Sequence, residues 1–401
     1  MPNLISFGGK VCLYGTIALA ASSCSKVLTS NPPPFSGDTL NFKVSPAPEW
    51  TNKFYRNEGF LGADGIFEMT LSGDESIGAG EKDSVLMYFS DTMTGSVVGD
   101  SSIKNFKMIN NSFAWITNGN RKNENFRIFY NTSESGEPIN YFNPETPQTQ
   151  PGDYYWFGDG FVNQDDNNSI NIFGYRTFDK SKASWDFEIR GVTLITIPGG
   201  AAFSEATQID LPLMADIKGK GKGTFGAGIF VNTKRAGAKN PDGYIYVYGV
   251  LDPNKQLVVA RVKPNEIRSI GAWRFWNGKD WDSSINNSHP ITDRVSNELS
   301  LTQLPDGRFL LVFQADGLGN HTAVRIGHSP LGPFGSLQKI WKAPELSEPP
   351  GLIPYNAKAH PVLSKKNRLL ISYNTISFDY LNEIHRFPHM YRPRFFWLEI
   401  Q

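Results

Sequence analysis

Residues 62–67 read "GADGIF", in which Asp64 lies among small residues directly before an apolar run. Glycine and aspartate both favour turns, so this stretch taken alone indicates only a turn. A comparable position nevertheless returns four more times, at intervals of 62 to 95 residues, within or beside similar apolar runs. The matched positions are Asp64, Asp159, Ala227, Glu298 and His360.

Each matched position belongs to a unit of short β-rich runs separated by Gly, Asn, Asp and Pro turns. The first runs of the five units are "GADGIFEMTLSG", "YYWFGDGFV", "TFGAGIFVN", "NELSLTQLPDG" and "NAKAHPVLSKKN". Helical periodicity is nearly absent from Asn52 onward, which predicts an all-β fold. Five units of this size predict one five-bladed β-propeller over residues 50–401. A two-domain β-sandwich protein is the main alternative, but it does not explain why polar residues return at the same place.

The first 23 residues contain one charge, Lys10, and a short apolar stretch that ends in "AASSC". The apolar stretch is too short to span a bilayer and is typical of a signal peptide. We interpret residues 1–23 as a lipoprotein signal and Cys24 as the lipidated residue; a plain secretory signal with an incidental cysteine is the alternative. The Ser- and Pro-rich residues 24–49 predict a flexible tether. We therefore expect a protein of the bacterial cell envelope, attached to a membrane through Cys24.

The charge balance argues against one class of partner. The chain has 39 basic and 39 acidic residues, whereas nucleic-acid binding needs an excess of Lys and Arg. We expect a monomer with no nucleic-acid partner. Aromatic residues make up 13% of the chain, which suits a β-protein or a sugar-binding surface.

In a propeller the innermost strand of every blade lines one central funnel, so the recurring polar residues should converge. Asp64 and the residue that ends the next run, Asp91 in "YFSDT", belong to the same unit. Unpaired buried carboxylates are costly, so such convergence indicates chemistry or a bound cation. The other residues expected to face this funnel are Asp159, Arg176, Glu298, His360, Asn374, Trp156 and Tyr355.

Several carboxylates with aromatic neighbours suit a glycoside hydrolase, in which one acid protonates the leaving oxygen and another attacks the anomeric carbon or activates water. Adjacent antiparallel strands bring Asp64 and Asp91 to the distance that such a pair needs. We predict Asp64 as nucleophile or general base and Asp91 as general acid, with the other seven residues binding substrate. The alternative is a non-catalytic glycan-binding lipoprotein that uses the same funnel.

No cofactor is expected from the sequence. A zinc site is not predicted, because His360 has no second histidine at ligand spacing. A structural calcium ion on the propeller axis is kept as an alternative, although no local loop motif supports it. Trp273, Trp276 and Trp281 are expected to pack in an outer strand rather than to bind sugar.

Six motifs in order resemble the domain of unknown function 5005 family of secreted bacterial proteins. They are "GADGIF", "NNSFAW", "YYWFGDGFV", "YNAKAHPVLS", "ISYNT" and "YRPRF", and they span the chain from about Trp50 to its end. The first-unit pattern also resembles glycoside hydrolase family 183, the endo-D-arabinanases formerly called domain of unknown function 4185. That resemblance implies an arabinan-like or other furanose-containing glycan and catalysis by Asp64 and Asp91.

Two features depart from the family 183 pattern. Ser90 stands where glycine is usual, and the segment between the two acids carries a longer insertion at residues 72–83. A looser likeness to five-bladed arabinanase-like hydrolases, whose three acids come from successive blades, makes Asp159 and Glu298 competing candidates.

Overall fold

The structure, a computed structural model, describes residues 39–99, 102–117, 126–183 and 185–401. Strands dominate these residues, and the α-helices are single turns, α1 (Pro48–Thr51) and α2 (Tyr380–Glu383). The prediction of an all-β fold is confirmed. The predicted signal peptide and Cys24 lie outside the described residues. Within the part described, no helix is long and apolar enough to cross a membrane.

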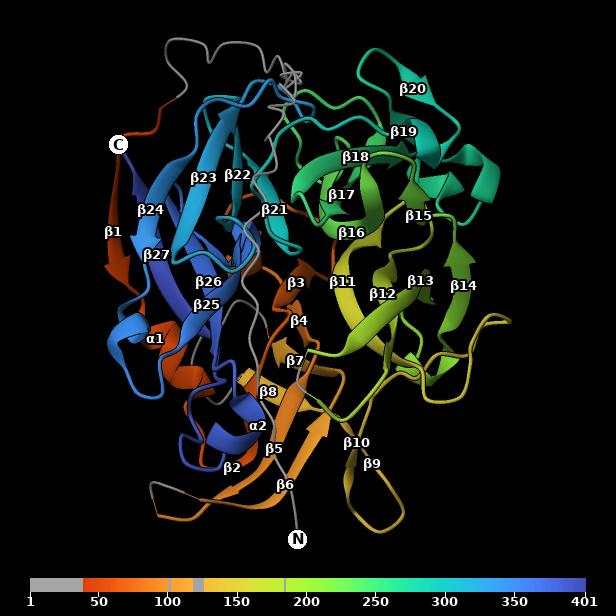
Figure 1. Cartoon of the computed structure of the whole chain (residues 1–401). Coiled ribbons are helices and arrows are strands. Elements are labelled where there is room, and N and C mark those ends of the chain that lie inside the picture. The colour runs from red at the N-terminus through yellow and green to blue at the C-terminus, as the bar shows by residue number, and fades with distance from the viewer. Residues whose placement is uncertain (1–38, 100–101, 118–125, 184) are drawn as a thin grey trace, which may run out of the picture. The chain divides into compact units, whose positions relative to one another are not determined.

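Five antiparallel sheets follow one another along the chain (Figure 1). The first contains β3 (Phe67–Thr70), β4 (Val85–Phe89), β7 (Ser112–Ile116) and β8 (Phe126–Phe129). The second contains β11 (Tyr154–Asn163), β12 (Ser169–Asp179), β13 (Phe187–Ile197) and β14 (Thr207–Leu211). The third contains β15 (Met214–Ile217), β16 (Gly221–Asn232), β17 (Tyr244–Asp252), β18 (Gln256–Val262), β19 (Arg274–Trp276) and β20 (Trp281–Asp282).

The fourth sheet contains β21 (Leu299–Gln303), β22 (Phe309–Gln314), β23 (His321–Gly327) and β24 (Gln338–Lys342). The fifth contains β25 (Ile353–Ala359), β26 (Arg368–Ile376), β27 (Arg394–Ile400) and β1 (Phe42–Pro46). Strand β1 comes from the start of the described chain and pairs with β27 at its end, from Phe42 opposite Ile400 to Pro46 opposite Phe396.

The five sheets pack against one another in chain order. Strands β3, β11, β16, β21 and β25 each contact the next one. Apolar clusters fill the space between neighbouring sheets, and one of them joins the fifth sheet to the first through Phe395 and Trp397 against Val85 and Phe89. Because burial of apolar area is the main favourable term in folding, these clusters stabilise the packing of neighbouring sheets.

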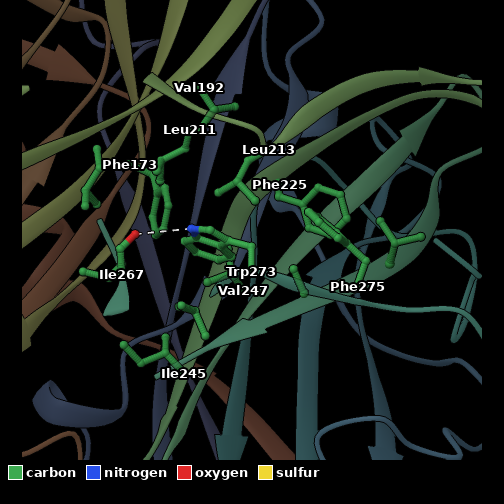
Figure 2. Close-up of a cluster of buried hydrophobic side chains, with 14 of the residues drawn as sticks. Phe173, Val192, Leu211, Leu213, Phe225, Ile245, Val247, Ile267, Trp273 and Phe275 are labelled. Carbon is green, nitrogen blue, oxygen red and sulfur yellow. Dashed lines mark hydrogen bonds between the residues drawn. The ribbon is translucent and has the colours of Figure 1, made fainter. Parts of the chain in front are cut away.

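The cluster between the second and third sheets shows how an outer strand packs (Figure 2). Trp273 is 1% exposed and lies among Phe173, Phe225 and Phe275. Its indole Nε1 donates a hydrogen bond to the carbonyl of Ile267 at 3.3 Å. Trp273 therefore packs in the core, and Trp276 and Trp281 are partly buried against the next cluster.

Strand β1 corrects the predicted extent of the tether, which includes residues up to 49. Phe42 and Val44 alternate with Lys43 and Ser45, and the two apolar side chains pack on the cluster between the fourth and fifth sheets. Two apolar positions in a proline-rich context are too short a pattern to reveal the strand.

A second correction concerns the first unit, in which "GADGIF" is expected to begin one strand. The segment instead splits into β2 (Glu58–Ala63) and β3, and the returning segment splits into β4 and β5 (Thr92–Val97). Strands β2 and β5 form a separate three-stranded sheet with β6 (Ile103–Ile109), and β9 (Asn131–Thr132) pairs with β10 (Pro138–Ile139).

The recurring position corresponds to a bulge in three of the five units, the second, third and fifth. The register shifts between Phe157 and Gly160 in β11, between Phe225 and Gly228 in β16, and between Tyr355 and Lys358 in β25. In the fifth unit the bulge begins at Tyr355, as it begins at Phe157 in the second. The match of the fifth unit at His360 is therefore wrong, because His360 lies after the end of β25. Asn356 takes a positive φ of 55° at the bulge, so the usual glycine signal is missing.

Candidate active site

Asp64 and Asp91 lie side by side where one long hairpin bends from the first sheet into the β2–β5–β6 sheet. The amide of Asp64 donates to the carbonyl of Asp91 at 3.0 Å, and the amide of Ser90 donates to the carbonyl of Asp64 at 2.9 Å. These bonds carry the pairing through the bend, where neither residue belongs to a strand. Both side chains keep part of their surface exposed.

Gly65 makes the bend possible. Its φ is +60°, and a Cβ there would lie 2.4 Å from Ser90 Oγ. Ser90 cannot retreat easily, because its hydroxyl accepts from the amide of Phe157 at 2.9 Å and donates to the carbonyl of the same residue at 3.1 Å. The serine that stands in place of the usual glycine thus ties the bend to β11.

We expect Gly65→Ala to lower the free energy of unfolding by about 2–5 kcal/mol, from a left-handed backbone of about 1–2 kcal/mol and overpacking of about 1–3 kcal/mol. The matched control is Gly99→Ala, since Gly99 has the same φ of +60° but a Cβ added there would meet no atom of the described residues within 4 Å. Urea denaturation of both variants measures the difference. Equal losses in the two variants would contradict the close packing against Ser90.

Each carboxylate has its own set of donors. The hydroxyl of Tyr355 donates to Asp64 Oδ2 at 2.9 Å, and Tyr391 also hydrogen-bonds Asp64. Asn110 Nδ2 and Trp156 Nε1 donate to Asp91 Oδ1 at 2.9 and 2.7 Å. All of these donors come from other parts of the chain, so the fold fixes both carboxyl groups.

The two carboxyl groups have different affinities for protons. Burial raises the pKa of Asp64 to about 6, although hydrogen bonds from Tyr391 and Tyr355 oppose the rise. Burial and then the charge of Asp64 raise the pKa of Asp91 to about 8, against the hydrogen bonds from Asn110 and Trp156. At neutral pH the pair therefore holds one proton, which resides on Asp91.

Trp156 gives a test of this division. Its N–H stabilises the charged form of Asp91, so we expect Trp156→Phe to raise the pKa of Asp91 further, by about one unit. Carboxyl ¹³C NMR of protein labelled at aspartate measures the shift. Phe187 packs on the indole at 4.5 Å between ring centroids and provides the control variant Phe187→Leu, which leaves the hydrogen bond in place. An unchanged or lowered pKa in Trp156→Phe would contradict the assignment.

Further polar and aromatic groups surround the pair. The hydroxyl of Tyr154 donates to Asp179 at 2.7 Å, and the charge of Asp179 contributes to the raised pKa of Asp91. The charges of Asp91 and Asp64 in turn raise the pKa of Tyr380, after burial. Tyr380 and Tyr391 come from the segment between β26 and β27, which has no β pattern, so sequence reasoning missed both.

Asn374 and Glu298 are also predicted to face the funnel. Both lie near the acid pair, but their hydrogen bonds go to other groups. Asn374 is buried and donates to the carbonyl of Ala63 at 2.7 Å, which positions the residue before Asp64. Glu298 accepts from Asn356 Nδ2 at 2.6 Å, and burial, followed by the charges of Asp64 and Asp159, raises its pKa well above the usual value against the opposing charge of Lys358.

Asp159 belongs to β11, and its carboxyl group has partners on β11, β16 and β25. Its two oxygens accept from the amides of Gly160 and Ile229 at 2.9 and 2.8 Å, and Lys358 Nζ is 3.9 Å away. Burial raises its pKa. Its carboxyl group thus joins β11 to β16.

His360 and Arg176 have other partners. His360 has no exposed surface and hydrogen-bonds Glu68 through Nδ1 and Ser372 Oγ through Nε2. Arg176 is 2% exposed and lies near Asp210 at 3.3 Å and Asp153 at 3.7 Å within the second sheet. The structure therefore does not bring either side chain to the acid pair.

The described residues contain no group of three or more His, Cys, Asp or Glu side chains placed to hold a metal ion. The charge of Lys358 opposes the raised pKa values of Asp159 and Glu298, and its ammonium group also lies 3.4 Å from the ring centre of Phe67.

Comparison with known proteins gives one family. The family model described as "Domain of unknown function (DUF5005)" matches residues 48–399. No curated protein sequence matches the chain.

Solved structures show likeness in fold. A "putative hydrolase" from Bacteroides ovatus ATCC 8483 is similar with a TM-score of 0.67 and 18% identity, over 92% of this chain and 93% of that one. A protein of unknown function from Dyadobacter fermentans DSM 18053 has a TM-score of 0.43 and 12% identity, over 92% and 100%. The α-L-arabinofuranosidase PaAbf62A from Podospora anserina has a TM-score of 0.41 and 10% identity, over 86% and 99%. The likeness in fold rests on the Bacteroides protein.

Proposed function

The chain belongs to the domain of unknown function 5005 family, and from this premise and the geometry of its acid pair we propose that it is a glycoside hydrolase. One observation carries the proposal: Asp64 and Asp91 lie side by side in a bend of paired backbone, and separate donors hold their two carboxyl groups. Burial raises their pKa values to about 6 and about 8, so we expect one to be ionised and the other neutral at pH 7. Pairs of acids whose environments separate their pKa values in this way are typical of glycosidases.

In the proposed reaction the neutral Asp91 gives its proton to the glycosidic oxygen as the bond to the anomeric carbon breaks. The Asp64 carboxylate either forms the new bond to that carbon or takes a proton from the water that does so. Tyr355 and Tyr391 hold the Asp64 carboxylate, while Asn110 and Trp156 both hold Asp91 Oδ1. Tyr154, Asp179 and Tyr380 are the neighbouring groups that would bind sugar hydroxyls.

We further propose that the five packed sheets are the blades of a five-bladed β-propeller, with β1 and β27 closing the last blade. The ring of clusters between neighbouring sheets supports this interpretation. An arabinan-like or other furanose-containing polysaccharide is the proposed substrate, and attachment to the cell envelope through Cys24 is the proposed location.

The test is a screen of the protein against a polysaccharide panel that includes D- and L-arabinans, with Asp64→Asn in parallel and products analysed by chromatography. We expect release of sugars by the wild-type protein and none by the variant. Glycan binding without release by either protein would instead support a non-catalytic binding protein.

A further inference from the structure

A cavity of about 350 Å³ lies apart from the acid pair, and neither Asp64 nor Asp91 lines it. Its walls come from the segment after β3 and from β11, β16, β21 and β25. Asp64 precedes β3, whereas the lining residues Glu75 and Ser76 follow that strand, so the cavity belongs to its opposite end. Its volume falls within the range of about 300–1,000 Å³ that is usual for small-molecule sites.

The insertion at residues 72–83 forms one wall of this cavity. The proposed chemistry of the acid pair gives no role to this insertion. The amide of Glu75 donates to the carbonyl of Ala236 at 3.1 Å, and the amide of Gly78 donates to the carbonyl of Pro361 at 2.9 Å. The insertion is thus fixed at Glu75 to the segment between β16 and β17, and at Gly78 to the segment after β25. The wall is preformed rather than a free loop.

Three polar atoms of the lining residues are buried and have no hydrogen-bond partner within the described part of the chain. They are Glu75 Oε1, Thr302 Oγ1 and Lys358 Nζ. Thr302 is 4% and Lys358 3% exposed. Lys358 has electrostatic compensation from Asp159 and from the ring of Phe67, but neither contact is a hydrogen bond. Buried polar groups are almost always hydrogen-bonded, so these three side chains of the cavity lining are the ones whose hydrogen bonds a molecule in the cavity would complete.

The chemistry of the lining selects the kind of partner. An anion would meet the carboxyl groups of Glu68, Glu75 and Asp159, and a cation would meet the ammonium group of Lys358. A neutral hydroxyl group both accepts from an ammonium group and donates to a carboxylate. Apolar walls from Ile77, Phe230 and Leu301 complement the C–H face of a small polyol. We propose that this cavity is a second ligand site, which binds a monosaccharide or a polyol of similar size.

The ionisation of Glu75 agrees with a neutral ligand. Burial, followed by the charges of Asp159, Glu68 and Asp74, raises the pKa of Glu75 well above its usual value. A neutral carboxyl group also donates a hydrogen bond, so the same contact to a hydroxyl group forms in either protonation state. The site does not depend on the proposed hydrolase activity.

Calorimetry of the full chain tests the proposal with D-arabinose, L-arabinose, D-galactose, D-glucose and glycerol as probes, and with calcium chloride and ethanolamine as charged alternatives. We expect one of the sugars or glycerol to bind at one site with a millimolar Kd. Glu75→Ala and Thr302→Val should each weaken this binding at least tenfold, whereas Asp64→Asn should leave it within twofold. Thr302→Val is isosteric and decides the result if Glu75→Ala does not fold.

Three results would overturn the second site. The first is an absence of binding by every sugar and glycerol at millimolar concentration. The second is binding that Asp64→Asn abolishes while Glu75→Ala and Thr302→Val retain it, which would place the sugar at the acid pair. The third is binding by calcium or ethanolamine alone.

Discussion

Asp91→Asn should lose about 10²–10⁴ of the wild-type kcat on a polysaccharide but stay within about tenfold of wild type on a nitrophenyl glycoside of the same sugar. The reason is that a sugar leaving group needs the proton of Asp91, whereas nitrophenolate leaves without it. Asparagine keeps the size and the hydrogen-bond acceptor of the neutral acid, and the bonds from Asn110 and Trp156 can persist.

Asp64→Asn should instead lose at least about 10³ on both substrates, because the bond-forming step needs its carboxylate whatever the leaving group is. The matched control is Asp216→Asn, an exposed aspartate on β15 that should retain full turnover. Steady-state rates on the two substrates provide the measurement. An equal loss by Asp91→Asn on both substrates would remove its role as general acid, and retained turnover in Asp64→Asn would remove the pair altogether.

The second large effect is on pH dependence. We expect kcat/KM to follow a bell centred near pH 7, with limbs that report the pKa of about 6 at Asp64 and of about 8 at Asp91. Below the first value Asp64 gains a proton and can neither attack nor act as base. Above the second value Asp91 loses the proton that it must donate. Each limb should change about tenfold per pH unit, and both values belong to the coupled pair.

The variants give this profile an internal control. In Asp91→Asn the alkaline limb should disappear and the acid limb should stay near pH 6, because asparagine carries the same charge as the protonated acid. Activity of both proteins measured from pH 4 to pH 10 on the polysaccharide, whose sugar leaving group needs the proton of Asp91, tests both statements. An optimum near pH 4, or a profile without an alkaline limb in the wild type, would contradict the raised pKa of Asp91.

Much of the fold could be predicted from the sequence, because turn residues and apolar runs repeat at similar spacing. The first, second and third runs of the five units correspond to strands such as β11, β12 and β13. Strands β2 and β5 could not be separated from β3 and β4, because the chain changes sheets without a turn motif at Gly65. In the fifth unit Asn356, not glycine, takes the positive φ at the bulge. Without a glycine to mark the bulge, the matched position is placed too late in the sequence, at His360.

The acid pair was predictable because its two members follow one another on a single hairpin. Their environment was not, since it depends on burial and on donors from distant segments such as Tyr391 and Asn110. Arg176 at a strand end has the same appearance in sequence as a pocket residue, yet Asp210 and Asp153 hold it within the second sheet. Only the packed structure distinguishes these cases.

The most direct test of the central claim needs no substrate. It is a carboxyl ¹³C NMR titration of the full chain labelled at aspartate, in which Asp64→Asn and Asp91→Asn assign the two signals. We expect Asp64 to titrate near pH 6 and Asp91 near pH 8, and the pKa of Asp91 to fall in Asp64→Asn because the neighbouring charge is removed. Titration of both groups near pH 4, with no change in the variant, would contradict the division of roles between the two acids.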